Sequence, residues 1–321
     1  MEGIKPGLPN LIGLSNWMGS HSIIVVQSSP YWILNWQCNT ATTRKLSALV
    51  QQTPLILKYH NGPLLKGNYS INLIWYGKFT RSQQSTIVDF IQSLSPNAPT
   101  PSQPSVAYWW RITDNYNPKS GPTHLDLGSQ VFDDKYDMGR SLKSSDIITL
   151  SNIIQGRDQI NIVLTAADVT VEGFCTSRCG THAPGKFIAP YIWVGNSASQ
   201  CPGQCAWPFH QAVYGPSMPA LKAPNGDVGM DGMVINIATL LAGAVTNPSG
   251  GGFYQGPKNA PMEAVSACTG MFGSGAYPGY PGRVPVDPKS GVSYNAFGLN
   301  GRKYLLPAMW DPITSQCSTL A

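Results

Sequence analysis

The sequence predicts a single α/β domain with a mixed sheet flanked by helices. A long, loop-rich C-terminal part that is cross-linked by disulfides follows. Three observations predict this fold. Segments typical of strands and of helices alternate along the chain from residue 55. The run at 160–165 (INIVLT) is largely apolar, as in a strand that is buried on both faces. Beyond Pro248 the chain becomes rich in Gly and Pro, and it still carries two cysteines.

The elements before residue 200 follow from local patterns. The β-rich run at 69–76 predicts a central strand. Thr80 is a suitable N-cap for a helix through residue 94, whose apolar face includes Ile87 and Phe90. Similar patterns predict helices at 105–116 and 144–154 and strands at 125–132, 160–165 and 191–194.

A buried helix is predicted at 231–246. Apolar residues recur there at helical spacing, with Asp231 as the N-cap and Asp227 in the preceding turn. Asn247-Pro248 then ends the helix, because proline cannot continue it.

Composition narrows the class of protein. Only 12% of the 321 residues are charged, about half the usual share, and the chain has 33 Gly and 27 Pro, which favours an extracellular protein. The net charge of +5 is spread without a basic stripe, so we expect no nucleic-acid partner; weak attraction to an acidic wall polysaccharide stays open. No run reaches the roughly 20 apolar residues of a membrane helix, so we expect no membrane span.

Six of the seven cysteines lie in the second half of the chain: Cys175, Cys179, Cys201, Cys205, Cys268 and Cys317. An even set with repeated C-x3-C spacing predicts three disulfides in an oxidising compartment, although the spacing does not say which residues pair. Zinc knuckles completed by His182 and His210 are the alternative, but these spacings match no common zinc module. Cys38 is expected to remain unpaired.

The N-terminal part is expected to be separate from the domain. Residues 1–44 lack helical or strand periodicity and the apolar run of a signal peptide, so we expect a poorly ordered extension, with the domain covering residues 45–321. Asn68-Tyr69-Ser70 is an N-glycosylation sequon near the first predicted strand. Glycosylation at Asn68 requires entry into the secretory route.

Several long motifs between residues 48 and 321 resemble the plant EXORDIUM-like family, also called phosphate-induced protein 1. The motifs are KYHNGPLLKG (58–67), NLIWYGKFT (72–80), FCTSRCGTH (174–182), YIWVGNSASQCPGQCAWPFH (191–210), EAVSACTGMFGSGAYPGYPGRVPVD (263–287) and GRKYLLPAMWDP (301–312). The resemblance implies a secreted protein of the apoplast or cell wall that takes part in cell expansion and brassinosteroid-responsive growth. Its partners would be a wall polysaccharide or an extracellular protein. The resemblance implies no particular reaction.

The predicted helix at 231–246 also resembles the active-site helix of zincin metallopeptidases, but without its chemistry. Where a zincin needs two metal ligands and a general base, this chain has Thr239, Leu240 and Gly243, which supply neither. Glu263 follows this helix in the chain, at a position where some metallopeptidases have a further metal ligand. We therefore expect a degenerate site at Thr239, Gly243 and Glu263, with no metal, no cofactor and no catalytic residue.

Two other classes of function remain open. An enzyme acting on wall carbohydrate would need two facing acids, for which Asp227 and Asp231 are candidates. A carbohydrate-binding protein would need exposed aromatic rings to stack on sugars. The candidates for such a platform are Trp75, Tyr76, Trp109, Trp110, Trp193, Trp207 and Trp310.

Overall fold

The computed structural model describes residues 55–321, except 97–102, 177, 186–189 and 214–217. All described residues belong to the unit Thr53–Ala321. The expectations for the extension 1–44 and for Cys38 therefore lie outside the described residues.

A five-stranded sheet forms the centre of this unit, in the order β3-β2-β5-β8-β7. Its strands are β2 (Gly67–Tyr76), β3 (Thr123–Asp133), β5 (Gln159–Thr165), β7 (Gly180–Pro184) and β8 (Pro190–Gly195). Four strands are parallel, and β7 runs antiparallel to β8 at one edge. The sheet is therefore mixed, as predicted, and the sequence analysis missed only its edge strand β7.

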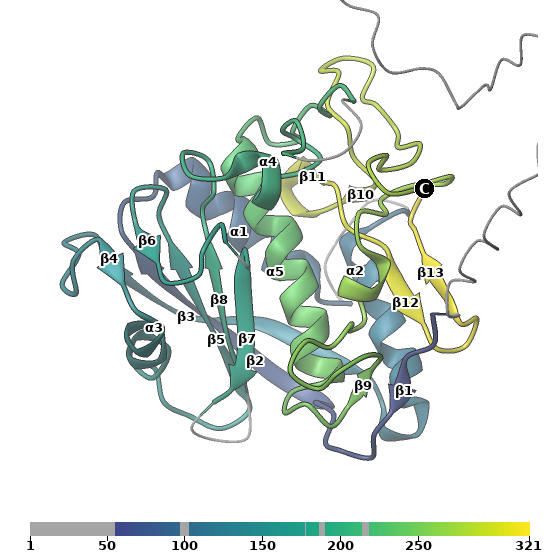
Figure 1. Ribbon diagram of the computed structural model, residues 1–321, viewed down its shortest axis with the longest axis horizontal. Helices are drawn as coiled ribbons and strands as arrows, with labels where there is room; N and C mark the ends of the chain where they lie inside the picture. Colours follow the sequence, from purple (N-terminus) through teal and green to yellow (C-terminus); the bar gives the residue numbers. More distant parts are fainter. Residues whose placement is uncertain (1–54, 97–102, 177, 186–189, 214–217) are drawn as a thin grey trace, which may run out of the picture. The chain divides into compact units, whose positions relative to one another are not determined.

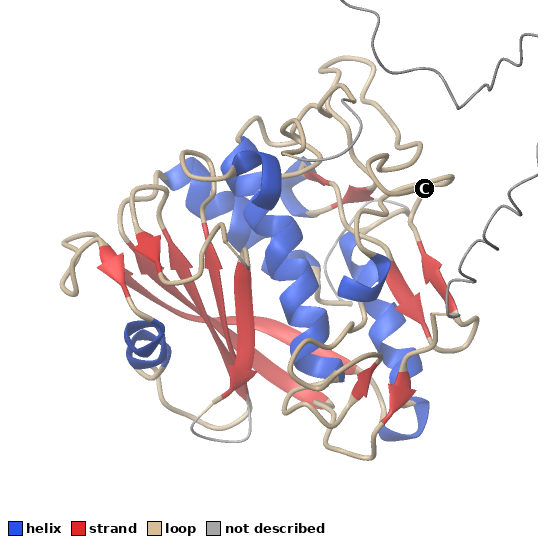
Figure 2. Cartoon of the chain, viewed as in Figure 1, coloured by secondary structure: helices blue, strands red, loops and turns tan. Residues whose placement is uncertain are grey.

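Helices cover both faces of the sheet (Figures 1 and 2). One face packs against α1 (Arg81–Ser93), α2 (Val106–Trp110) and α5 (Val228–Thr246), and the other against α3 (Ser144–Ser151). Strand residues alternate between the two layers: Ile162 and Ile192 pack with α5, whereas Val163 and Trp193 pack with α3. This alternation decides which side chains of β7 and β8 can meet in a site.

The helix boundaries follow from their caps. Thr80 caps α1 through a reciprocal bond pair with Gln83, as the sequence predicts. The helix expected at 105–116 begins at its Ser105 cap, but it becomes a 3-10 helix at Arg111–Tyr116. The prediction for α5 was wrong by one turn: Asp227 is its N-cap and Asp231 lies in its first turn. Asn247 ends α5 as expected.

The remaining elements are short. The strand pairs are β1 (Lys58–Tyr59) with β9 (Phe253–Tyr254), β4 (Ser141–Leu142) with β6 (Thr170–Val171), β10 (Ala296–Phe297) with β11 (Lys303–Tyr304), and β12 (Met309–Asp311) with β13 (Gln316–Ser318). The helical turns are α4 (Pro202–Cys205), η2 (Pro118–Ser120), η3 (Ser266–Cys268) and η4 (Leu299–Gly301). The loop-rich character expected beyond Pro248 is confirmed.

Among the described helices, α5 is the one whose length and apolar composition would allow it to cross a membrane. However, 72% of its most apolar window is buried in the protein. The helix packs as a core element between the sheet and the C-terminal loops.

Candidate functional site

Glu263 pairs with His182 beside the C-terminal half of α5. The His182 Nε2 lies 2.7 Å from the Glu263 Oε2, and the Asn247 Nδ2 donates to the Glu263 Oε1 at 2.6 Å. The His182 and Glu263 side chains are only 11% and 13% exposed. We call these three residues the α5 cluster.

Each member of the α5 cluster is held by its own element. His182 lies on β7 and points toward α5, because its pairing partner Ile192 packs in the same layer. The Asn247 Oδ1 accepts from the Gly252 backbone N–H at 2.8 Å, which fixes the orientation of the amide. The Glu263 N–H donates to the Ser266 Oγ at 2.8 Å. The cluster is therefore positioned before any ligand arrives.

Gly243 leaves the room that the His182–Glu263 pair occupies. A Cβ built at position 243 would lie 2.5 Å from the Glu263 Oε2 and 2.9 Å from the His182 Nε2. Gly243 and Glu263 are thus brought together, as the sequence analysis expected. Thr239 lies one turn earlier, and its hydroxyl donates to the Ile235 carbonyl oxygen instead. Leu240 packs against the backbone at Gly180.

The chemistry of the α5 cluster is limited by access. When the His182 Nε2 donates to the Glu263 Oε2, Nδ1 is the remaining ring nitrogen that could act on another group. This Nδ1 is buried and has no hydrogen-bond partner among the described residues, so none of their hydroxyls or thiols is activated by it. The described residues also contain no group of three or more His, Cys, Asp or Glu that could hold a metal ion. The sequence analysis considered His182 only as a zinc-knuckle ligand and missed its pairing with Glu263, which lies 81 residues away.

Replacing Gly243 by alanine should destabilise the protein, although alanine is the better helix former by about 1 kcal/mol. The added methyl group collides with the His182–Glu263 pair, and overpacking of this kind costs about 1–3 kcal/mol. We expect a lower free energy of unfolding in urea. The same substitution in a Glu263→Ala background removes the main collision and should cost less; equal costs in both backgrounds would contradict this explanation.

The six predicted cysteines form three disulfides: Cys175–Cys201, Cys179–Cys205 and Cys268–Cys317. The first two join the loop before β7 to the two ends of α4, which follows β8, and the Cys201 and Cys205 sulfurs lie 3.6 Å apart. The zinc-knuckle alternative is therefore wrong for these cysteines, because zinc binds cysteine thiolates and a disulfide contains none.

The aromatic platform expected from tryptophans is not formed by most of its candidates. Trp75, Tyr76, Trp109, Trp110, Trp193 and Trp310 are all 3% exposed or less, because their rings fill the core. Trp207 is half-buried and packs against Phe272. These six buried rings cannot stack on an external sugar, so that interpretation was wrong for them.

A second polar region surrounds the start of α5. Both oxygens of Asp231 accept hydrogen bonds from Asn225, at 2.9 Å from its backbone and 2.7 Å from its side chain. The Asn225 Oδ1 accepts from Arg302, which also pairs with Asp89 at 2.5 Å. An open groove of about 530 Å³ lies beside Asp89, Asn225 and Arg302. Asp227 caps α5 and binds Gln83, so Asp227 and Asp231 serve the helix start and do not face each other as a catalytic pair.

Fold and site define an α/β protein with a mixed sheet, three disulfides and a largely covered His–Glu pair. The chain belongs to the phosphate-induced protein 1 (EXORDIUM) family, because the profile "Phosphate-induced protein 1 conserved region" matches residues 57–320. It is 59% identical over 284 residues to Protein EXORDIUM-like 2 of Arabidopsis thaliana, covering 85% of this chain and 92% of that protein. It is 54% identical over 297 residues to Protein PHOSPHATE-INDUCED 1 of Nicotiana tabacum, covering 88% and 95%.

No solved structure matches this chain significantly. The resemblance to zincins therefore has no support from a structural neighbour. It rests only on the place of α5 beside the sheet and on Glu263 next to Gly243.

Proposed function

We propose that this chain is a secreted protein of the plant apoplast or cell wall that takes part in brassinosteroid-responsive growth. The observation that carries this proposal is the set of three disulfides. Structural disulfides persist in extracellular compartments and are rare in the reducing cytosol. The role in growth is what the resemblance to the EXORDIUM family implies.

The proposed action is binding and not catalysis, with the α5 cluster as a degenerate metallopeptidase-like site. One oxygen of the Glu263 carboxylate pairs with His182 and the other accepts a hydrogen bond from Asn247. The remaining ring nitrogen, the His182 Nδ1, is buried from solvent. Little of either side chain is exposed, so a substrate has limited access to this pair. A carbohydrate-binding protein of the cell wall is the second candidate, favoured by a cavity with polar and aromatic lining on the α3 face of the sheet.

Glycosylation at Asn68 tests the secretory route. Asn68 is exposed and is the second residue of β2, so it lies within the strand and not before it as predicted. Expressed in leaf cells behind a signal peptide, the protein should appear in apoplastic fluid with a glycan that endoglycosidase removes. Asn68→Gln is the control and should abolish the mobility shift while leaving secretion intact.

The same experiment on the chain as it stands, with residues 1–44 in place, tests secretion of the native form. Thiol labelling before lysis reports the redox state of the six cysteines. A protein that stays in the cytosol with six labelled thiols would contradict the proposed function.

A further inference from the structure

A cavity of about 150 Å³ lies at the β7 edge of the sheet, on the face that packs against α3. Thr181 of β7 and Trp193 of β8 pair across the strands and line one wall. Tyr191, which pairs with Ala183 two positions further along, lines the same wall. Arg178 and Glu172 line it from the loop before β7, and Ser144 and Ile147 line it from α3. The cavity is thus on the opposite face of the sheet from the α5 cluster.

Arg178 is fixed in position by the chain around it. It immediately precedes Cys179, and its carbonyl oxygen accepts from the Cys175 N–H at 3.2 Å, so the Cys175–Cys201 and Cys179–Cys205 disulfides hold the loop from both ends. Gly173 gives the guanidinium room, since a Cβ there would lie 2.9 Å from the Arg178 Nε. This Nε is buried and has no hydrogen-bond partner among the described residues.

A buried guanidinium nitrogen without a partner indicates a missing acceptor. Leaving a buried polar group unsatisfied is costly, and native structures usually satisfy it with protein, water or a ligand. The nearby Glu172 carboxylate does not fill this role: its Oε2 accepts from the Ser144 N–H and hydroxyl at the start of α3, at 3.2 and 3.0 Å. Arg178 therefore retains a donor for a group that enters the cavity.

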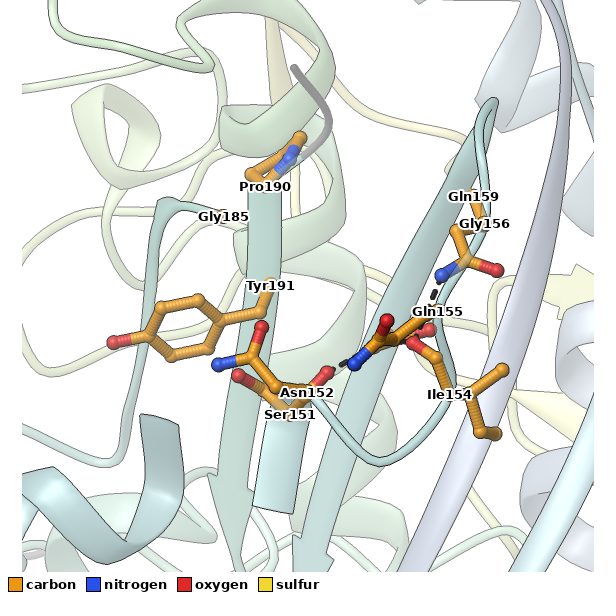
Figure 3. A pocket seen from close by; sticks show the side chains of 10 residues that line it. Ser151, Asn152, Ile154, Gln155, Gly156, Gln159, Gly185, Pro190 and Tyr191 are labelled. Atoms are coloured by element: carbon orange, nitrogen blue, oxygen red, sulfur yellow. Dashed lines mark hydrogen bonds between the residues drawn. The ribbon is translucent and has the colours of Figure 1, made fainter. Parts of the chain in front are cut away.

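The rest of the wall suits a polyol. Thr181 and Tyr191 carry hydroxyls, and Glu172 keeps a second carboxylate oxygen as an acceptor. Tyr191 also borders a smaller cavity of about 30 Å³, where it lies near Ser151 and Asn152 at the end of α3 (Figure 3). That space holds about one water or one hydroxyl group. The polar lining therefore continues past Tyr191 along the sheet edge.

We propose that the cavity binds a carboxylated sugar, the uronic acid residue of an acidic oligosaccharide. Arg178 pairs with the sugar carboxylate through its guanidinium fork, the geometry that guanidinium and carboxylate share. Tyr191, Thr181 and Glu172 hydrogen-bond the ring hydroxyls. The net charge of +5 attracts such an acidic chain to the protein. The choice of a wall sugar rests on the proposed extracellular function, whereas the site itself rests on the cavity.

Calorimetric titration of the purified, oxidised protein with digalacturonate tests the site. We expect saturable binding that Arg178→Met weakens at least about tenfold, because a charge-assisted hydrogen bond is lost. Tyr191→Phe should weaken binding less. Arg81→Met removes an exposed arginine outside the cavity and is the matched control, which should bind like the wild type. Thermal unfolding of each variant shows whether it is folded, and Arg178→Lys keeps the charge if the methionine variant is not.

Neutral digalactose and inorganic phosphate distinguish the ligand chemistry. Binding of digalacturonate that neither probe matches supports a uronate site. Equal binding of digalactose, competition by phosphate at similar concentration, or unchanged affinity of the Arg178 variants would each overturn the proposal. A protein that is secreted with its disulfides formed but does not bind digalacturonate would refute this site and leave the proposed extracellular function standing.

Discussion

Replacing Cys268 and Cys317 together by alanine should lower the free energy of unfolding by about 4 kcal/mol and the melting temperature by roughly 10 °C. The disulfide joins residues 49 positions apart, and closing a loop of that length removes much of the entropy of the unfolded chain. It also ties β13 to the core, because Cys268 is only 1% exposed. Urea unfolding of the oxidised proteins measures the difference.

The Cys175–Cys201 disulfide provides a matched comparison. It joins residues 26 positions apart, and Cys179–Cys205 still holds the same two segments together, so removing it should cost less, at most about 3 kcal/mol. Its loss should weaken digalacturonate binding, because it helps to hold Arg178, whereas loss of Cys268–Cys317 should not. A cost below about 1 kcal/mol for both removals would show that the disulfides are not structural.

The sequence predicts the central layers of this fold because their signals are local. The apolar run at 160–165 became β5, and Thr80 capped α1, since each needs only residues within one strand or one helical turn. The antiparallel edge strand β7 was missed because Gly180–Pro184 is short, and four of its five residues are half-buried without an alternating pattern. Its assignment depends on hydrogen bonds to β8 that local composition does not reveal.

The candidate site was only partly predictable, for the same reason. Glu263 stood out as an acid in an apolar segment, and Gly243 as a small residue on a buried helix face. Their partner His182 comes from a strand 81 residues earlier, so no spacing rule connects them. Likewise, the unpartnered Arg178 Nε depends on two disulfides whose pairing the spacing leaves open. Both sites arise from the tertiary packing of the β7 edge.

Asp231→Asn should remove a fall in stability that the wild-type protein shows as the pH rises toward neutrality. Burial raises the pKa of Asp231 from 3.8 to about 7, against the two hydrogen bonds from Asn225, which lower it. The nearby Asp227 charge raises the pKa further. Burial raises the pKa of the neighbouring Tyr304, and the Asp231 charge adds to this rise. Arg302 is linked to Asp231 only through Asn225. Asp231 therefore has no direct cationic partner among the described residues.

The sign of the pH dependence follows from the proton count. Between the unfolded pKa of 3.8 and the folded value of about 7, the folded state holds a proton that the unfolded state has lost. The stabilisation is thus complete below the lower value and disappears as the pH rises through the upper one, on the order of 2–4 kcal/mol in total. The wild type should be more stable in an acidic extracellular space than at neutral pH.

Urea unfolding of both proteins across this pH range measures the slope. Asparagine cannot ionise, so the Asp231→Asn protein should show a flatter profile, even if the new amide meets the Asn225 N–H unfavourably and lowers stability at every pH. Asp227→Asn keeps a side chain that can cap α5 but removes a charge that raises the pKa of Asp231, so its stability should still fall with rising pH, with the fall ending at a lower pH than in the wild type. If the Asp231→Asn and wild-type profiles ran parallel, another group would have to account for the pH dependence, and Asp231 would be ionised in the folded protein.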